Sequence, residues 1–206
     1  MDDVIERAAP LGSRSAPDSL AVLSWNVLAD CYATQDGEPQ RGKGVDHVPL
    51  ADLAWPTRCA RILAELVAAD ADVVCLQEVE PSAFAQEFSP TLSAAGYDGL
   101  IQKNDHRVGT ATFWRREKLS CVWENHRSRS LVTVPQHQQQ RDPGREGEGA
   151  GEAGQQQRCI AVVNVHLQGH ASETLARVKQ LSSSLRHLSN HAREFAQPSS
   201  HRRPLS

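Results

Sequence analysis

Polar residues interrupt or close three apolar segments of this 206-residue chain. Asn26 lies within "LSWNVLA", Glu78 closes "VVCLQEV", and His166 follows Asn164 in "VVNVHL". A buried amide without a hydrogen bond costs about 1–3 kcal/mol, so Asn26 needs a polar partner, and a phosphate group would serve. Glu78 has two interpretations, because a carboxylate at a strand end is either the first residue to reach solvent or a ligand. Three such interruptions in one chain favour a functional site.

The residues around Asn26 and Glu78 predict a strand, a helix and a second strand. Residues 19–30 predict the first strand, and residues 72–79 predict a buried strand of β-branched and aliphatic side chains. The helix between them covers residues 55–72 and places four apolar residues on one face: Ile62, Leu63, Leu66 and Val67. A helical crossover joins parallel strands, so we expect the carboxyl ends of the two strands to be neighbours. Residues 34–49, rich in Gly, Pro and Asp, predict a long surface loop.

The remaining sequence predicts a helix, a set of antiparallel strands and a last helix. The first of these helices covers roughly residues 82–95 and ends at Gly96. Strands are expected within the following ranges: 97–104, 109–118, 119–128, 130–135 and 159–169. The last helix starts near Ser172 and carries apolar residues three and four positions apart: Leu175, Val178, Leu181, Leu185 and Leu188.

Residues 20–195 are expected to form one α/β domain. Within it, residues 136–157 contain no aromatic residue and no aliphatic residue except alanine, so this insertion is predicted to be disordered. A flexible leader at residues 1–19 and a disordered tail at residues 196–206 complete the predicted organisation.

The composition is that of a globular protein, with 39% hydrophobic residues and a formal net charge of −3. It gives no overall tendency toward nucleic acid or membranes, and no apolar run is long enough to cross a bilayer. The first ten residues have no signal-peptide character, and the five scattered cysteines are interpreted as reduced. We therefore expect a cytoplasmic or nuclear location and no membrane partner; the composition does not indicate an oligomeric state.

Four motifs in order resemble the endonuclease/exonuclease/phosphatase superfamily: "LSWNVLADCYA", "VVCLQEV", "GTATFW" and "VVNVHL". A W-x-x-R helix start at residues 55–58 precedes the second motif. The "SWNVLAD" stretch and the following Tyr32 are most similar to catabolite-repressor-type and nocturnin-like deadenylases. The resemblance extends from about Leu20 to Leu188, without the insertion.

The resemblance implies a four-layer α/β sandwich like that of deoxyribonuclease I, with a metal-dependent phosphoesterase site at one edge. Glu78 would then bind Mg²⁺, with Mn²⁺ as the alternative ion, because Mg²⁺ prefers oxygen ligands and keeps several waters. Asn26 would orient the phosphate or metal-bound water, and His166 would contact the scissile phosphate and could protonate the leaving oxygen. Asn164 is expected to hold the loop. The implied substrate is a phosphodiester, RNA in the first place, hydrolysed from its 3′ end.

The sequence also departs from this family. Family members carry a later D-x-N motif, whose aspartate orients the attacking water, and an S-D-H motif, whose histidine contacts the phosphate; neither is present here. The sandwich is therefore expected to be incomplete on its C-terminal side, and the 206-residue chain alone to be inactive. The alternatives are a non-catalytic remnant that binds partners, a DNA-repair endonuclease, and a phosphatase of small metabolites. "QGH" after "NVHL" also departs from the deadenylase pattern and weakens the case for adenine specificity.

Other polar residues have simpler interpretations. The histidine pairs 166/170 and 187/191 are four residues apart but lack the further ligands that zinc needs. The basic residues near the C-terminus are interpreted as a solvated helix face and tail rather than an RNA site. The four tryptophans are expected to pack within the sandwich: Trp25, Trp55, Trp114 and Trp123.

Overall fold

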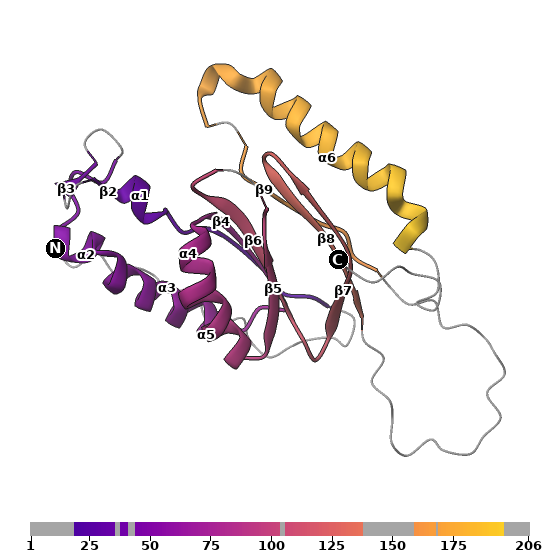
Figure 1. The fold of residues 1–206 in the computed structure, drawn as a ribbon, viewed down its shortest axis with the longest axis horizontal. Coiled ribbons are helices and arrows are strands. Elements are labelled where there is room, and N and C mark those ends of the chain that lie inside the picture. The colour runs from indigo at the N-terminus through magenta and orange to yellow at the C-terminus, as the bar shows by residue number, and fades with distance from the viewer. Residues whose placement is uncertain are drawn as a thin grey trace, which may run out of the picture.

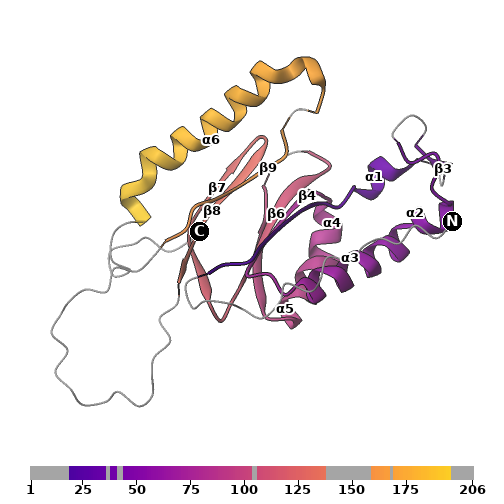
Figure 2. The same cartoon turned by 180° about the vertical axis from the view of Figure 1, so that it is seen from behind.

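Two β-sheets lie face to face between two layers of helices (Figure 1), and the view from behind shows the same order of layers (Figure 2). The structure is a computed structural model that describes residues 19–35, 38–40, 44–103, 106–137, 159–167 and 169–195. Its layers confirm the predicted four-layer α/β sandwich. The predicted tail, the leader up to residue 18 and the insertion from residue 138 onward lie outside the described residues.

The first sheet has the strand order β1-β4-β6-β5. Its strands are β1 (Val22–Asn26), β4 (Val73–Val79), β6 (Gly109–Arg115) and β5 (Tyr97–Ile101). β1 and β4 are parallel, with Asn26 opposite Gln77, and helix α3 (Trp55–Ala69) is the crossover between them. The predicted strand–helix–strand unit is therefore confirmed, and it brings the ends of β1 and β4 together.

Helix α3 begins with a proline in its first turn and ends at Asp70, whose φ of 50° is left-handed. Ile62 and Leu66 on its inner face are buried, as the sequence predicted. Val67, which we placed on the same face, is 43% exposed. Adjacent positions on a helix are about 100° apart, so Val67 lies beyond the edge of the buried stripe.

The stretch between β1 and α3 contains short elements. They are α1 (Asp30–Ala33), β2 (Thr34–Gln35), β3 (Glu38–Pro39) and α2 (Leu50–Leu53). The prediction of a loop throughout residues 34–49 was wrong for β2 and β3, which pair antiparallel. Pairing of two residues on each side needs only backbone groups, so hydrophobic periodicity does not reveal it.

The helical segment predicted at residues 82–95 is present in three parts: α4 (Pro81–Ala83), the π-helix η1 (Phe84–Phe88) and α5 (Ser89–Ala94). It turns at Gly96, whose φ of 90° suits a residue without a side chain. Phe88 and Leu92 are fully buried and pack with α3 against the first sheet.

The second sheet consists of β7 (Leu119–Arg127), β8 (Ser130–His137) and β9 (Val162–Val165), paired antiparallel in this order. The predicted antiparallel character of these strands is confirmed, whereas their order comes from the structure. β8 extends two residues into the predicted insertion. Gln136 there is buried, lies opposite Ser120 and forms a bridge to Cys159.

Strand β4 is buried on both faces, which explains its continuous apolar run. Val74 and Leu76 belong to the core cluster on the side of α3 and α5, which also contains Phe113. Val73 and Cys75 belong to a smaller cluster between the sheets. This alternation follows from the two-residue period of a strand and leaves only the end of β4 free to reach solvent.

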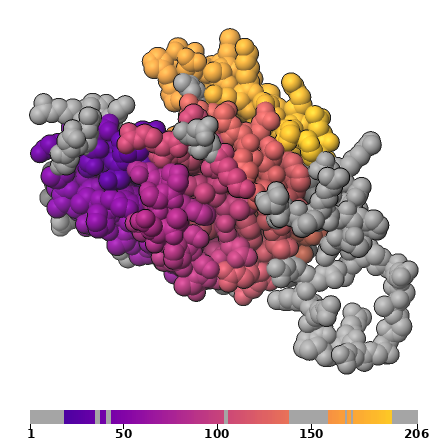
Figure 3. Space-filling model, viewed as in Figure 1, coloured from indigo at the N-terminus to yellow at the C-terminus, as the bar shows by residue number. Residues whose placement is uncertain are grey.

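Helix α6 (Thr174–Phe195), preceded by the 3₁₀ turn η2 (Ala171–Glu173), stands at the surface outside the second sheet (Figure 3). Its side toward the sheet is mainly polar: Ser184 shares a hydrogen bond of 2.7 Å with Ser130, and Arg127 donates to Ser183. Four of its five predicted apolar residues are exposed: Leu175, Val178, Leu181 and Leu185. The predicted helix is therefore present, with its apolar stripe turned to solvent. No helix in the described parts of the chain is long and apolar enough to cross a membrane.

Candidate functional site

Asn26, Glu78 and His166 meet at one edge of the sandwich. Asn26 ends β1, Glu78 lies near the end of β4, and His166 directly follows β9. The side-chain amide of Asn26 donates a hydrogen bond of 2.8 Å to Oε1 of Glu78. Nε2 of His166 lies 3.4 Å from the same oxygen. The fold thus brings together the three residues that the sequence singled out, although Asn26 is exposed and not the buried amide that the sequence analysis assumed. Their catalytic and metal-binding roles stay predictions.

The backbone of Glu78 is left-handed, with a φ of 60°. Next to it, the pairing of β4 with β6 shifts between Leu76 and Val79, so the strand contains a bulge. Bulges redirect side chains, and a left-handed non-glycine residue costs about 1–3 kcal/mol that the surrounding structure must offset. The bulge lets the Glu78 carboxylate reach Asn26 and His166 rather than follow the regular alternation of the strand.

The segment after β1 directs backbone N–H groups to three side chains at the site: Asn26, Glu78 and Glu80. Leu28, with a φ of 54°, donates its N–H to the side-chain oxygen of Asn26 at 3.0 Å. The N–H of Ala29 points to Oε2 of Glu78 at 3.4 Å, and the N–H of Cys31 donates to Glu80 at 2.8 Å. The left-handed turn at Leu28 therefore directs successive amides toward the acidic end of β4.

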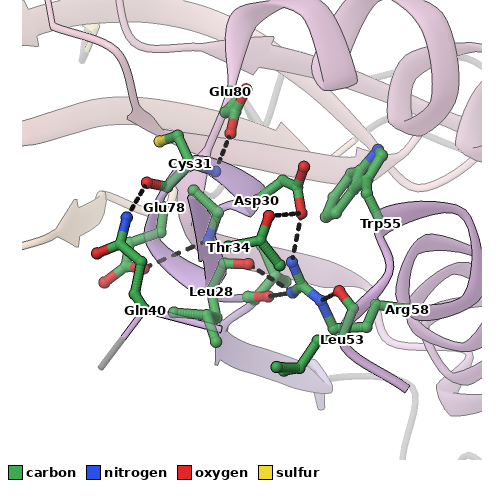
Figure 4. A network of polar contacts seen from close by, with 12 residues as sticks. Leu28, Asp30, Cys31, Thr34, Gln40, Leu53, Trp55, Arg58, Glu78 and Glu80 are labelled. Carbon is green, nitrogen blue, oxygen red and sulfur yellow. Dashed lines mark hydrogen bonds and ion pairs between the residues drawn. The ribbon is translucent and has the colours of Figure 1, made fainter. Parts of the chain in front are cut away.

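Arg58 of α3 holds this segment in place (Figure 4). Its guanidinium donates to the carbonyl oxygens of Leu28 at 2.6 Å and Leu53 at 2.8 Å, and it forms an ion pair of 3.4 Å with Asp30. The same group lies 5.2 Å from the ring centre of Trp55, within the range of a cation–π contact. The arginine of the W-x-x-R motif thus fixes the turn that lines the candidate site.

The Glu78 carboxyl group is suited to carry a negative charge. Its side chain is only 13% exposed. The hydrogen bond with His166 is the main cause that lowers its pKa from the usual 4.5; burial opposes this effect, and the contacts with Asn26 and Ala29 add to it. Glu78 is therefore ionised at neutral pH, the state that a metal ligand requires.

This lowered pKa predicts a specific pH dependence of stability. The contribution of ionised Glu78 is fully present above the unfolded pKa and is lost as the pH falls through the lower folded pKa. We expect the difference in free energy of unfolding between the wild type and Glu78→Gln to be constant from about pH 7 to 5 and to shrink below about pH 4. Urea unfolding across this range measures it, with exposed Glu65 on α3 (Glu65→Gln) as the control. A difference that stays constant down to about pH 3 would contradict the prediction.

The donor set at this edge fits a hard divalent cation held by a single carboxylate. Among the described residues no group of three or more His, Cys, Asp or Glu side chains is placed to hold a metal ion. Nearby Glu80 and Asp30 are already bonded to Cys31 and Arg58. Mg²⁺ and Mn²⁺ tolerate one protein carboxylate with waters and substrate oxygens, whereas a structural zinc site needs four ligands. Glu78, with the amide of Asn26 beside it, therefore suits Mg²⁺ or Mn²⁺.

Asn164 has a different place from the one expected. It is 3% exposed and donates to the carbonyl oxygens of Leu76 in β4, at 3.1 Å, and Ala111 in β6, at 2.9 Å. It also accepts a hydrogen bond of 2.9 Å from Gln77. The expectation that Asn164 holds a loop was wrong: its buried amide joins β9 of the second sheet to β4 and β6 of the first.

The histidines and cysteines that the sequence analysis also considered make contacts that hold the fold together. His170 interacts with Ser172 at the start of η2. His187 and His191 pack against the ring of Trp123, with centroid distances of 5.9 and 5.6 Å, and attach α6 to β7. None of the five cysteines forms a disulfide bond, and burial raises the pKa of Cys31 and Cys75 to about 11.

The sequence analysis did not single out two basic residues that lie near the site. Arg107, between β5 and β6, and Arg129, between β7 and β8, line a cavity with His166. The only available signal was the polar stretch "KNDHRVG" between two strands, which resembles any surface loop. Their proximity to the site depends on how two hairpins approach each other.

Comparison with known proteins identifies a family. Residues 23–179 match the sequence profile of the Endonuclease/Exonuclease/phosphatase family, which is more than half of the chain. "Carbon catabolite repressor protein 4 homolog 1" of Arabidopsis thaliana is 37% identical over 124 residues, which are 54% of this chain and 19% of that protein. The "CCR4-Not complex 3'-5'-exoribonuclease subunit Ccr4" of Phaeosphaeria nodorum is 39% identical over 86 residues, or 42% of this chain and 13% of that protein. The chain therefore spans about a fifth or less of the length of these relatives.

The fold also matches solved structures. The crystal structure of ANGEL2, a 2',3'-cyclic phosphatase, in complex with adenosine-2',3'-vanadate superposes with a TM-score of 0.62 at 22% sequence identity. The match covers 83% of this chain and 48% of that chain. At this identity the similarity concerns the fold, and it agrees with the sandwich described above.

Proposed function

The chain belongs to the endonuclease/exonuclease/phosphatase family, and we propose on this basis that Asn26, Glu78 and His166 form the metal- and phosphate-binding part of an RNA phosphodiesterase site. The proposal rests on one observation: the contacts of Asn26 and His166 with the same oxygen of a glutamate held in a left-handed conformation. A glutamate that only marked the point where a strand reaches solvent would need neither the left-handed backbone of Glu78 nor its contacts with Asn26 and His166.

Each residue then has a distinct chemical task. Ionised Glu78 would hold Mg²⁺, which supplies charge neutralisation at the phosphoryl oxygens when it is bound. Asn26 is fixed by its hydrogen bonds to Glu78 and Leu28, so its amide can orient a phosphate oxygen without losing much conformational entropy. His166, half-buried and 3.4 Å from Glu78, would donate a proton or hydrogen bond to the phosphate.

RNA cleaved from its 3′ end is the substrate that the relatives favour. The Phaeosphaeria nodorum protein is named as a 3′-5′-exoribonuclease subunit, and the relative from Arabidopsis thaliana carries the carbon catabolite repressor name. A substrate of this kind agrees with the cytoplasmic or nuclear location expected from the sequence.

The chain supplies part of the catalytic groups that the family resemblance implies. The sequence contains no D-x-N and no S-D-H motif, so the groups expected to orient the attacking water and to contact the phosphate from the other side are absent from these 206 residues. We therefore propose binding of metal and phosphodiester by this chain, without efficient turnover.

Metal-dependent binding of a short RNA tests this proposal. A fluorescent RNA trinucleotide is too short to reach far beyond the site, and its affinity should rise at least about tenfold when Mg²⁺ replaces EDTA, because the metal adds an oxygen-binding centre at Glu78. Glu78→Gln should abolish the increase, whereas the surface variant Glu65→Gln should keep it.

Two results would overturn the proposal. A Mg²⁺-dependent increase that survives in Glu78→Gln would place the metal elsewhere, and an absence of any increase in the wild type would remove the metal site. A DNA trinucleotide with the same affinity as the RNA would contradict the assignment of RNA as the substrate.

A further inference from the structure

A cavity of about 320 Å³ opens beside the candidate site. His166 lines it, together with residues from the β5–β6 and β7–β8 connections and from α1: Tyr32, Gln102, His106, Arg107, Val108, Gly109, Ser128 and Arg129. The N–H of His166 donates to the carbonyl of Arg129 at 3.0 Å, so the histidine of the site and the wall of the cavity are directly connected.

The walls of this cavity are held by buried hydrogen bonds. Gln102, 5% exposed, donates to the carbonyl of Arg127 and accepts from the backbone N–H and hydroxyl of Thr110 at 3.2 Å each. The N–H of Lys103 donates to His126 at 2.9 Å. These bonds join the β5–β6 connection to the β7–β8 hairpin, so the cavity is formed before any ligand arrives.

A second cavity of about 230 Å³ shares two lining residues of the β7–β8 hairpin with the first one. Ser128 and Arg129 line both cavities. Arg127 of β7 and Lys179 of α6 add two more cationic side chains to the second. No Asp or Glu is among the described residues that line either cavity. In a protein with a net charge of −3, this is a local concentration of positive charge. We call the two cavities together the basic groove.

Arg107 and Arg129 form no ion pair within the described parts of the chain, whereas Arg58, Arg61, Arg115 and Arg116 each have an aspartate partner. Unpaired guanidinium groups in a preformed concave surface match the geometry of phosphate oxygens. Tyr32 also lines this cavity, and nucleic-acid bases stack on aromatic rings of this kind.

We propose that the basic groove binds a single-stranded polynucleotide along several phosphates beyond the one at Glu78. This inference rests on the proposed function, because the groove begins at His166, one of the three residues of the proposed site. Cations spread over two adjoining cavities suit a chain of phosphates better than one mononucleotide, and the combination of guanidinium groups with aromatic faces suits nucleic acid better than an acidic peptide. The protein would therefore select polymers over small phosphate esters.

Binding of a 15-nucleotide fluorescent RNA in EDTA tests the groove separately from the metal site. The double variant Arg107→Gln/Arg129→Gln should weaken binding at least about tenfold and reduce the slope of log K against log salt by about 0.7 for each lost phosphate contact. Lys179→Gln should weaken binding to a smaller extent. Arg61→Gln, at an exposed arginine of α3 that pairs with Asp52 and lines neither cavity, removes the same type of charge and should leave binding unchanged.

The outcomes separate this inference from the proposed function. Glu78→Gln should bind the 15-nucleotide RNA in EDTA like the wild type, even if it loses Mg²⁺-dependent binding of the trinucleotide. If the double variant keeps its midpoint of thermal unfolding and binds the 15-nucleotide RNA as tightly as Arg61→Gln, the proposal that the basic groove binds a polynucleotide is wrong. A single-stranded DNA of the same length should bind with similar salt dependence, since the phosphates are shared; weak, salt-independent binding of both polymers would also overturn it.

Discussion

Residues 1–206 should show no turnover of poly(A) RNA, abasic DNA or phosphorylated metabolites above a Glu78→Ala control, in Mg²⁺ or in Mn²⁺. The reason is that catalytic groups act as a unit, and the loss of one member can remove roughly 10⁴-fold in rate. The site built by Asn26, Glu78 and His166 offers a charge for the metal and donors for the phosphate. Among the described residues, these three include no aspartate that could orient the attacking water.

A discontinuous assay with end-labelled RNA, and release of inorganic phosphate from small esters, would measure this rate. The metal-dependent binding of the trinucleotide serves as the positive control for a folded site. A Mg²⁺-dependent rate that Glu78→Ala abolishes would contradict the prediction and would mean that another residue of this chain replaces the absent aspartate.

Asn164→Ala should lower the free energy of unfolding by about 3 kcal/mol, because it leaves buried polar groups without partners and creates a small cavity. The carbonyl oxygens of Leu76 and Ala111 lose a donor, and the side chain of Gln77 loses its acceptor. All of these contacts cross from one sheet to the other, so the loss should affect the docking of the sheets as a whole.

Urea unfolding followed by tryptophan fluorescence measures this effect. Asn190→Ala is the matched control, because Asn190 is exposed on α6 and its replacement should change the stability by less than about 0.5 kcal/mol. Asn164→Asp distinguishes the hydrogen bonds from the volume: a carboxylate cannot donate to the two carbonyl oxygens, so it should destabilise the protein at least as much as alanine. If both Asn164 variants were as stable as the control, the link between the sheets would not depend on this amide.

The order of elements and the meeting of the ends of β1 and β4 follow from the sequence, because burial sets a local pattern that can be read along the chain; His166 reaches them from β9 of the other sheet. The apolar run of β4, the helical spacing of Ile62 and Leu66 in α3, and the polar residue at each strand end all depend on neighbours in sequence. A parallel strand–helix–strand unit then leaves little choice about which ends lie together.

Local patterns did not predict the features that arise from contacts distant in sequence. Glu78 reaches its partners through a bulge and a left-handed backbone, and neither follows from its residue type. Asn164 and Gln77 pair across the two sheets, 87 positions apart. The turn that lines the site is fixed by Arg58 from α3, at a distance of 30 positions from Leu28.

The sequence by itself determined the fold class, the family and the three residues that meet at the site, since hydrophobic periodicity and short motifs are properties of contiguous residues. The tertiary structure alone decided which face of α6 turns to solvent, because an amphipathic pattern shows that a helix has an apolar stripe and not whether that stripe is covered. It also decided that Arg107 and Arg129 share a cavity with His166. Two loops can approach each other only after both sheets have packed, so the electrostatics of the site depend on the folded chain.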